Sequence, residues 1–441
     1  MTSYWCEHAV LPGGVRPSVR VVVDRGRITE VVPNRAAEPA DVTLGGVVLP
    51  GLANGHSHTF HRALRGRTQD GAGTFWTWRE AMYAVTRLLD PDTYHHLARA
   101  VFVEMLLAGY TTVGEFHYVH HGPGGRPYED PNAMGEALLE AARETGIRMT
   151  LLDTCYLAGG LTADGHLPLD EVQQRFSDGS VEAWAQRVEA LPDGDTVRIG
   201  TAVHSVRAVP REHLAAVGDV AARGARPLHV HVSEQPGENH ACQEFYGCSP
   251  TELLAAEWLL TPMTTAVHAT HLSDADVQLL AGSRTTACFC PTTERDLADG
   301  IGPARRLSDA GVPLSLGSDQ HAVVDPFEEL RGVEMNERLD SLQRGRFGAA
   351  DLLAMGSLHG YRSLGWDDGG LLAVEHLADL VAVRLDSPRT AGCAPESVVF
   401  AATAADVTDV VVHGEHVVRD GQHRIGEAGA MLGDAIAAVS R

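Results

Sequence analysis

The stretch that decides the fold is Leu49-Pro50-Gly51-Leu52-Ala53-Asn54-Gly55-His56-Ser57-His58, where an apolar run leads through a Pro-Gly bend to two histidines. The apolar run that leads into this stretch, Val47-Val48-Leu49, predicts a buried strand. Residues two apart in an extended segment point to the same side, so both imidazoles can reach one metal ion from a single strand end. Because solvated or hydrogen-bonded histidines are a common alternative, the metal interpretation depends on whether later strands supply further ligands.

Length and composition indicate a soluble globular chain of more than one domain. A chain of 441 residues is too long to form one simple core. With 44% hydrophobic and 21% charged residues, its composition is that of a globular protein and not of a disordered chain. The net charge of -23 argues against nucleic acid or an anionic membrane surface as a partner, since both require a basic face. A run of 18 apolar residues is absent and the first residues do not resemble a signal peptide, so we expect a cytoplasmic protein.

Two residue types limit the chemistry that the chain can perform. The sequence contains no lysine, so neither a Schiff-base lysine nor a carboxylated lysine that bridges two metal ions is possible. The seven cysteines are odd in number and include no C-x-x-C pair, so structural disulfides and a cysteine-based zinc site are not expected.

The pattern of apolar residues divides the chain into three parts. Residues 1–48 and 370–426 alternate in the β manner, and we expect both to form one small β-sandwich domain. Over residues 49–369 short apolar strands alternate with helical stretches, which predicts an α/β fold of the (β/α)8 barrel type. After the strand before His56, further barrel strands are expected at 111–116, 148–154, 197–203, 227–232, 264–268, 285–290 and 312–317. A helical tail is expected over residues 427–441.

Chemically active side chains stand where these strands end. The first strand ends in His-x-His, the fifth in His231 followed by Glu234, the sixth in His268 and the eighth in Asp319. The carboxyl ends of barrel strands meet at one face, so these side chains are expected to converge rather than to be scattered polar caps. Three imidazoles and a carboxylate suit a borderline cation, most simply Zn2+, with iron and manganese left open.

This set of strand ends resembles the amidohydrolase superfamily, whose pattern is His-x-His after strand one, His after strands five and six, and Asp after strand eight. The resemblance covers the whole chain, including the sandwich built from both ends. It implies four metal ligands, which are His56, His58, His231 and Asp319. It implies three catalytic residues, which are Glu234, His268 and Asp319. Without a bridging lysine, a single divalent ion is expected.

The expected chemistry is addition of a metal-activated water to a C=N or C=O carbon. Glu234, three residues past a ligand, is placed to carry protons to the substrate nitrogen, as in the deaminase branch of the superfamily, where ammonia is released. His268 is placed to orient the nucleophile and to stabilise charge in the transition state. The simpler alternative for Glu234 is a loop salt bridge.

A second resemblance concerns the substrate. The block Phe75-Trp76-Thr77-Trp78-Arg79-Glu80 follows the first strand, where loops can cover a barrel site. With 115–121, 204–207 and 317–321 it resembles the formimidoylglutamate deiminase family of histidine degradation, which converts N-formimidoyl-L-glutamate to N-formyl-L-glutamate and ammonia. The resemblance implies four substrate-binding residues, which are Arg79, Tyr118, His204 and Arg207. Two arginines suit bidentate binding of a dicarboxylate, although either could instead form a surface ion pair.

One residue departs from that family. The family has Phe-Gln-Arg-Ala after His-x-His, with the glutamine on the substrate, whereas this chain has Phe60-His61-Arg62-Ala63. His61 can still donate a hydrogen bond, but its length and charge differ, so another formimidoyl or guanidino acid is an alternative substrate. The segment 288–295 also looks atypical and is expected to face the same mouth.

Two other functions compete with this reading. One is deamination of a purine, pterin or cytosine ring, which would use the same metal chemistry but favour stacking and amide groups over arginines. The other is a non-catalytic barrel used as a binding module, although such barrels tend to lose ligands. A homodimer is expected from the resemblance alone, with a small molecule as the binding partner.

Overall fold

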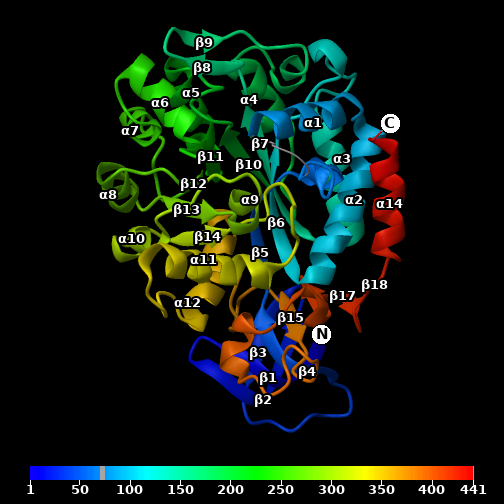
Figure 1. The fold of residues 1–441 in the computed structure, drawn as a ribbon. Coiled ribbons are helices and arrows are strands. Elements are labelled where there is room, and N and C mark those ends of the chain that lie inside the picture. The colour runs from blue at the N-terminus through cyan, green and yellow to red at the C-terminus, as the bar shows by residue number, and fades with distance from the viewer. Residues whose placement is uncertain (70–74, 441) are drawn as a thin grey trace.

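The computed structural model describes residues 1–69 and 75–440, and of Phe75 and Trp76 it describes the backbone alone. Figure 1 shows a barrel with a sheet of terminal strands at one end and the hairpin β8 (Gly160–Thr162) to β9 (Gly165–Leu167) at the opposite end. In this described part of the chain no helix combines the length and apolarity that a membrane crossing requires.

The barrel is one sheet of eight parallel strands in the order β14-β13-β12-β11-β10-β7-β6-β5. Their bounds are β5 (Leu52–Ser57), β6 (Tyr110–His117), β7 (Arg148–Cys155), β10 (Val197–Val203), β11 (Leu228–Val232), β12 (Thr264–His268), β13 (Thr286–Phe289) and β14 (Leu314–Leu316). These strands are buried almost throughout, which explains why they read as apolar runs instead of alternating ones. The (β/α)8 prediction is confirmed.

The barrel closes where β5 meets the turn after β14. Ser57 and Asp319 form a parallel bridge. The His58 amide donates to the Asp319 carbonyl at 3.1 Å, and the Asp319 amide donates to the His56 carbonyl at 3.0 Å. The predicted ligands of the first and last strands therefore stand on the seam that joins the two ends of the sheet.

Helices follow the strands and cover the barrel. The sequence pattern predicts helices at 93–107, 132–145, 180–191, 211–223, 249–259, 273–280, 304–310 and 327–340, and places the region 349–365 in the outer layer. The structure has there α2 (Pro91–Ala108), α3 (Ala133–Thr145), α4 (Val181–Ala190), α5 (Arg211–Arg223), α7 (Pro250–Ala256), α8 (Asp274–Ser283), α10 (Ala304–Asp309), α11 (Pro326–Ser341), α12 (Ala349–Ala354) and α13 (Gly360–Ser363). Local sequence sets several starts: α2, α7 and α8 each begin at a capping box, formed by Asp90, Ser249 and Ser273.

Three helices depart from the sequence prediction. They are α1 (Phe75–Arg87), α6 (Pro236–Tyr246) and α9 (Pro291–Asp296). The aromatic block 75–80, interpreted as a covering loop, is the start of α1, and the side chain of Trp76 lies outside the described residues. Proline makes the starts of α6 and α9 look like loops, yet its fixed φ and missing N–H suit the first turn of a helix.

The terminal strands form a second sheet in the order β18-β17-β16-β15-β4-β1-β2-β3. Its bounds are β1 (Thr2–Leu11), β2 (Gly14–Asp24), β3 (Arg27–Val32), β4 (Val42–Pro50), β15 (Leu380–Val383), β16 (Val407–Val412), β17 (Glu415–Arg419) and β18 (Gln422–His423). Parallel pairing of β1 with β4 and antiparallel pairing of β4 with β15 join the two chain ends, as predicted. The helix α14 (Ala428–Ala438) then runs alongside α2 (Figure 1).

The run 47–49 belongs to this sheet and does not supply a barrel strand, so that expectation is wrong. The Pro50-Gly51 bend redirects the chain, and the barrel begins only with β5. Gly51 permits the bend because a Cβ there would lie 2.5 Å from the hydroxyl oxygens of Thr111 and Tyr361. From the sequence alone, an apolar run followed by a bend does not indicate which of the two sheets the run pairs with.

A buried ion pair joins the barrel to the terminal sheet. Arg148, at the start of β7, donates to both Asp379 oxygens, with Nε–Oδ2 at 3.0 Å and an NH2–Oδ1 distance of 3.1 Å. Tyr361 Oη donates to the same carboxylate at 2.6 Å, and the His413 amide donates to it at 2.7 Å. Removing either charge would leave the other buried without a counter-ion.

We therefore expect Asp379→Ala to lower the free energy of unfolding by about 3–5 kcal/mol, the cost of isolating a buried charge. Denaturant unfolding followed by circular dichroism measures it. The control is Asp368→Ala, which removes the exposed partner of Arg27 and should cost no more than about 1 kcal/mol. Equal losses in the two variants would contradict a special role for the junction pair.

Candidate active site

The predicted site residues come together at the C-terminal ends of the barrel strands. The donors come from β5 and the residue after it (His56, His58), β11 (His231), β12 (His268) and the turn after β14 (Asp319). A cavity of about 370 Å³ opens here. All predicted site residues except His56 line it, namely His58, His61, Arg79, Tyr118, His204, Arg207, His231, Glu234, His268 and Asp319. His56 is fully buried beside Asp319.

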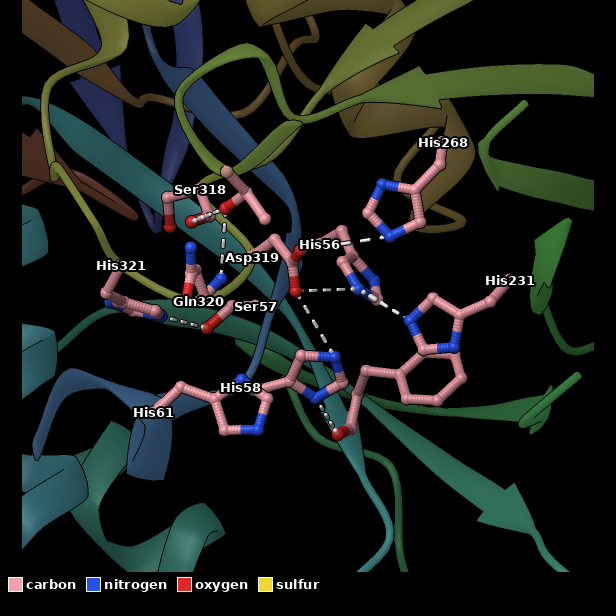
Figure 2. Close-up of polar contacts among 12 residues, drawn as sticks. His56, Ser57, His58, His61, His231, His268, Ser318, Asp319, Gln320 and His321 are labelled. Carbon is pink, nitrogen blue, oxygen red and sulfur yellow. Dashed lines mark hydrogen bonds and ion pairs between the residues drawn. The ribbon is translucent and has the colours of Figure 1, made fainter. Parts of the chain in front are cut away.

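The four predicted ligands have the spacing of a metal shell. Asp319 Oδ1 lies 3.5 Å from His56 Nε2 and 3.4 Å from His58 Nε2. The Nε2 atoms of His231 and His56 are 3.1 Å apart. Bonds of about 2.1 Å in a tetrahedral shell place ligand atoms about 3.4 Å from one another. Figure 2 shows these side chains pointing toward one another around the Asp319 carboxylate.

Hydrogen bonds behind the ligands fix which ring nitrogen faces the centre. His58 Nδ1 donates to the Phe116 carbonyl at 3.0 Å, and His231 Nδ1 donates to the His204 carbonyl at 2.8 Å. Burial, reinforced by His56, lowers the pKa of His58 to about 3, and burial likewise holds the pKa of His231 well below its usual value. His58 thus turns a bare nitrogen toward the Asp319 carboxylate, and His231 turns one toward His56; a cation at the centre would satisfy these groups together.

Glu115 supports the segment that carries His56 and His58. The sequence interpretation did not assign it a role. Its carboxylate accepts hydrogen bonds from the Ser57 hydroxyl and from the Thr59 amide and hydroxyl, each at 2.7 Å. Burial raises the pKa of Glu115 to about 7, although these hydrogen bonds act to lower it. The position of this acid near the end of a buried strand could have indicated its importance from the sequence. Its hydrogen bonds hold the segment that carries the two histidines.

The backbone is strained where catalytic groups are expected. His268 has φ +69° and Asp319 has φ +41°, in the left-handed region that non-glycine residues rarely adopt. Such conformations persist only where the surrounding structure imposes them, and they concentrate at active sites. Here they aim two side chains from strand ends into the cavity.

His268 lies among three carboxylates. Its Nε2 is 3.8 Å from Glu234 Oε1 and 3.8 Å from Asp319 Oδ2, and its Nδ1 is 3.5 Å from Glu294 Oε1. Burial alone would lower the pKa of His268, but these acids outweigh it and raise the pKa well above its usual value. The segment 288–295 therefore meets the site through Glu294, behind His268, whereas we expected it at the mouth.

The predicted substrate residues line the cavity. Arg207 NH2 lies 3.7 Å from Glu234 Oε2. Arg79 comes from α1 and donates from Nε to Tyr83 Oη at 2.8 Å. His61 Nε2 is 3.1 Å from Tyr118 Oη, and its ring meets Trp78 edge-on with centroids 5.0 Å apart.

The remaining predicted residue, His204, is neutral. Burial first and Arg207 second hold its pKa well below the usual value. Its Nδ1 lies 3.2 Å from the Ser205 hydroxyl, and its ring meets Tyr156 with centroids 4.6 Å apart. A neutral imidazole here can donate to a substrate oxygen without adding charge.

A second buried group, made by His117, His120 and Asp153, has the composition of a metal site. Its donors are already engaged, however. Asp153 accepts two bonds from Arg187, at 2.6 and 2.7 Å, and His120 Nε2 donates to the Thr154 carbonyl at 2.9 Å. The guanidinium supplies the positive charge, so this cluster is a structural network.

A barrel whose strand ends carry this histidine and aspartate set defines a class of hydrolases. The model of the amidohydrolase family matches residues 47–417, and the chain belongs to that family. Within it, the chain is 37% identical to formimidoylglutamate deiminase of Pseudomonas aeruginosa, over 96% of each chain. It is also 31% identical to 8-oxoguanine deaminase of the same organism, over 91% of this chain and 90% of that one.

A solved structure agrees with this assignment. The crystal structure of an amidohydrolase from Brucella melitensis matches with a TM-score of 0.92 and 31% identity, over 100% of both chains. The expected resemblance to the amidohydrolases is thereby confirmed. The chain is an enzyme that acts on C–N bonds of a small molecule, and its relatives support hydrolytic deamination.

Proposed function

We propose that this enzyme hydrolyses N-formimidoyl-L-glutamate to N-formyl-L-glutamate and ammonia, with one divalent metal ion, most simply Zn2+. The observation that carries the proposal is the pair Arg79 and Arg207 in the wall of the cavity that holds the donor set. In a chain of net charge -23, a dicarboxylate needs local cations to enter. The relative at 37% identity supports the same substrate.

The donor set suits a single ion held by His56, His58, His231 and Asp319, with no lysine to bridge a second one. Such an ion supplies a nucleophilic water near neutral pH. Asp319 keeps a second oxygen, which faces His268 and can accept the proton of that water.

The chain's own groups perform the remaining steps. Glu234 lines the cavity and can deliver a proton to the departing nitrogen, so that it leaves as ammonia. His268, which lies among the carboxylates of Glu234, Glu294 and Asp319, can orient the attacking water and offset charge in the tetrahedral intermediate. Arg79, Arg207, Tyr118 and His204 hold the two carboxylates of the substrate, and His61 lies beside the ligands to orient the formimidoyl group.

The second candidate is deamination of a nucleobase ring. Aromatic side chains also line the cavity, among them Tyr83, Tyr156 and Phe176, and the 8-oxoguanine deaminase relative acts on such a ring. An ammonia-release screen over N-formimidoyl-L-glutamate, guanidino acids, guanine, 8-oxoguanine, adenosine and cytosine separates the two. Activity on a base without activity on the acid would overturn the proposal. Failure to bind any divalent metal would favour a non-catalytic barrel.

His61→Gln tests the one departure from the family. Because glutamine also offers a donor and an acceptor to Tyr118, we expect kcat/KM for N-formimidoyl-L-glutamate to stay within about tenfold of wild type. His61→Leu is the control, which removes the polar partner and should cost more. If a guanidino acid is the true substrate, His61→Gln should shift the preference toward N-formimidoyl-L-glutamate.

Arg207→Lys should raise KM for N-formimidoyl-L-glutamate by about tenfold, since lysine replaces a two-pronged donor with a point charge. Steady-state kinetics measures it. Arg211→Lys is the matched control, because Arg211 pairs with Glu257 outside the cavity. Unchanged KM and kcat would mark Arg207 as structural. The homodimer and the cytoplasmic location stay predictions, the first of them open to measurement by light scattering.

A further inference from the structure

Glu238 is a buried acid that neither the fold nor the proposed chemistry has yet used. It lies in the first turn of α6, four residues after Glu234, and is 3% exposed. No side chain among the described residues hydrogen-bonds its carboxylate, although the Glu234 backbone contributes to holding its pKa down. A buried carboxylate with so few partners is costly, so an apolar side chain would serve stability better unless the charge has a use.

The guanidinium of Arg207 faces Glu238. Its Nε lies 3.9 Å from Glu238 Oε1, while its terminal nitrogen NH2 lies 3.7 Å from Glu234 Oε2. Arg207 and Glu234 line the cavity, whereas Glu238 stands outside its wall. Burial raises the pKa of Glu238 to about 6, although Arg207 opposes the shift. Two acids therefore share the guanidinium: Glu234, which lines the cavity, faces its NH2 nitrogen, and Glu238, which does not, faces its Nε.

This arrangement decides where the Arg207 fork points. With Glu234 as its single anionic neighbour, the guanidinium would close the 3.7 Å gap into a direct ion pair. That pair would engage the carboxylate needed for proton transfer and would turn the fork away from a substrate carboxylate. Glu238 faces the Nε–H of the same edge, at 3.9 Å, so Glu234 does not take both N–H groups of that edge and the outer end of the guanidinium is left for a substrate carboxylate.

We propose that Glu238 is a positioning residue, which holds the Arg207 guanidinium off Glu234 with its fork directed at the carboxylate of the substrate. The proposal rests on the proposed function, because it assumes a carboxylate-bearing substrate. Glu238 would act only through Arg207 and would not contact the reacting atoms. It also explains why a buried charge is retained behind the cavity.

The test is Glu238→Gln, which keeps the shape and removes the charge. We expect KM for N-formimidoyl-L-glutamate to rise about tenfold, the usual scale for a supporting partner, with a smaller change in kcat. Calorimetric titration with N-formyl-L-glutamate, which keeps both carboxylates, should show the same loss of affinity. The matched control is Glu244→Gln on the same helix, an exposed acid paired with His240, which should leave every value unchanged.

A double-mutant cycle shows whether the effect passes through Arg207. Glu238→Gln should raise KM in the wild-type background and have no further effect in an Arg207→Gln background. A full effect in both backgrounds, or a loss of kcat with unchanged KM, overturns the proposal. If Glu238→Gln does not fold, Glu238→Asp, which keeps the charge but shortens the side chain, enters the same cycle with the same expectation.

The outcomes separate this proposal from the one it rests on. A metal-loaded wild type that is inert on N-formimidoyl-L-glutamate overturns the proposed function and this inference together. An active wild type in which Glu238→Gln behaves like Glu244→Gln overturns the inference alone. Metal content that matches wild type, and a wild-type circular dichroism spectrum at the assay temperature, show for each variant that the fold and the donor set are intact.

Discussion

Replacing Glu234 with glutamine is expected to lower kcat on N-formimidoyl-L-glutamate by at least ~100-fold, the usual contribution of a general acid–base group. The carboxylate lines the cavity beside His268, and an amide of the same shape cannot carry a proton to the departing nitrogen. Ammonia release under saturating substrate measures the loss. The variant should keep its metal, because Glu234 is outside the four-residue donor set.

The control is again Glu244→Gln, with the same chemical change at an exposed position. Near-normal turnover of the Glu234→Gln variant would remove this residue from the mechanism and restore the simpler reading, a salt bridge to Arg207. A loss of metal together with activity would point instead to a role in holding the ion.

The second large effect is expected from Asp319→Asn. The change removes the one anionic ligand and the acceptor for the water proton, and loss of several kcal/mol of transition-state stabilisation corresponds to at least ~1000-fold in kcat/KM. Metal content by mass spectrometry should fall with it. Chelation of the wild type should have the same effect, and added Zn2+ should restore activity.

Asp409→Asn provides the control for general damage. Asp409 pairs with His416 at 2.9 Å on the terminal sheet, so this variant also breaks an Asp–His contact, but far from the cavity. Its metal content and activity should be normal. Full activity in a metal-free Asp319→Asn protein would refute the metal-dependent mechanism.

Much of the barrel could be predicted because its strands are apolar on both faces and end in polar groups. β10 and β12 have the predicted bounds, and β6, β7, β11, β13 and β14 differ by one or two residues at one or both ends, since the last residues of a strand read like the turn that follows. The run 47–49 failed because pairing, which local sequence does not encode, assigned it to the terminal sheet.

The active site also contains residues that could be predicted from the sequence and residues that could not. Residues at the end of a strand or in the turn after it, such as His231 and Asp319, could be placed by counting strands, because the fold itself brings strand ends together. Groups that support them could not. Glu294 meets His268 only through the placement of α9, and Glu238 meets Arg207 only through a helix that its proline and glycine disguise.

The seam of the barrel has a consequence for how the chain folds. Asn54 donates to Ser318 across 264 positions of sequence, so the last closure of the sheet confines a very long loop. By simple chain statistics that confinement opposes closure by about 5 kcal/mol. The proposed metal ion would have ligands on both sides of the seam, so it would bind only the closed state and favour closure by mass action. Chelation should therefore speed unfolding as well as stop turnover, with β5 and β14 separating first.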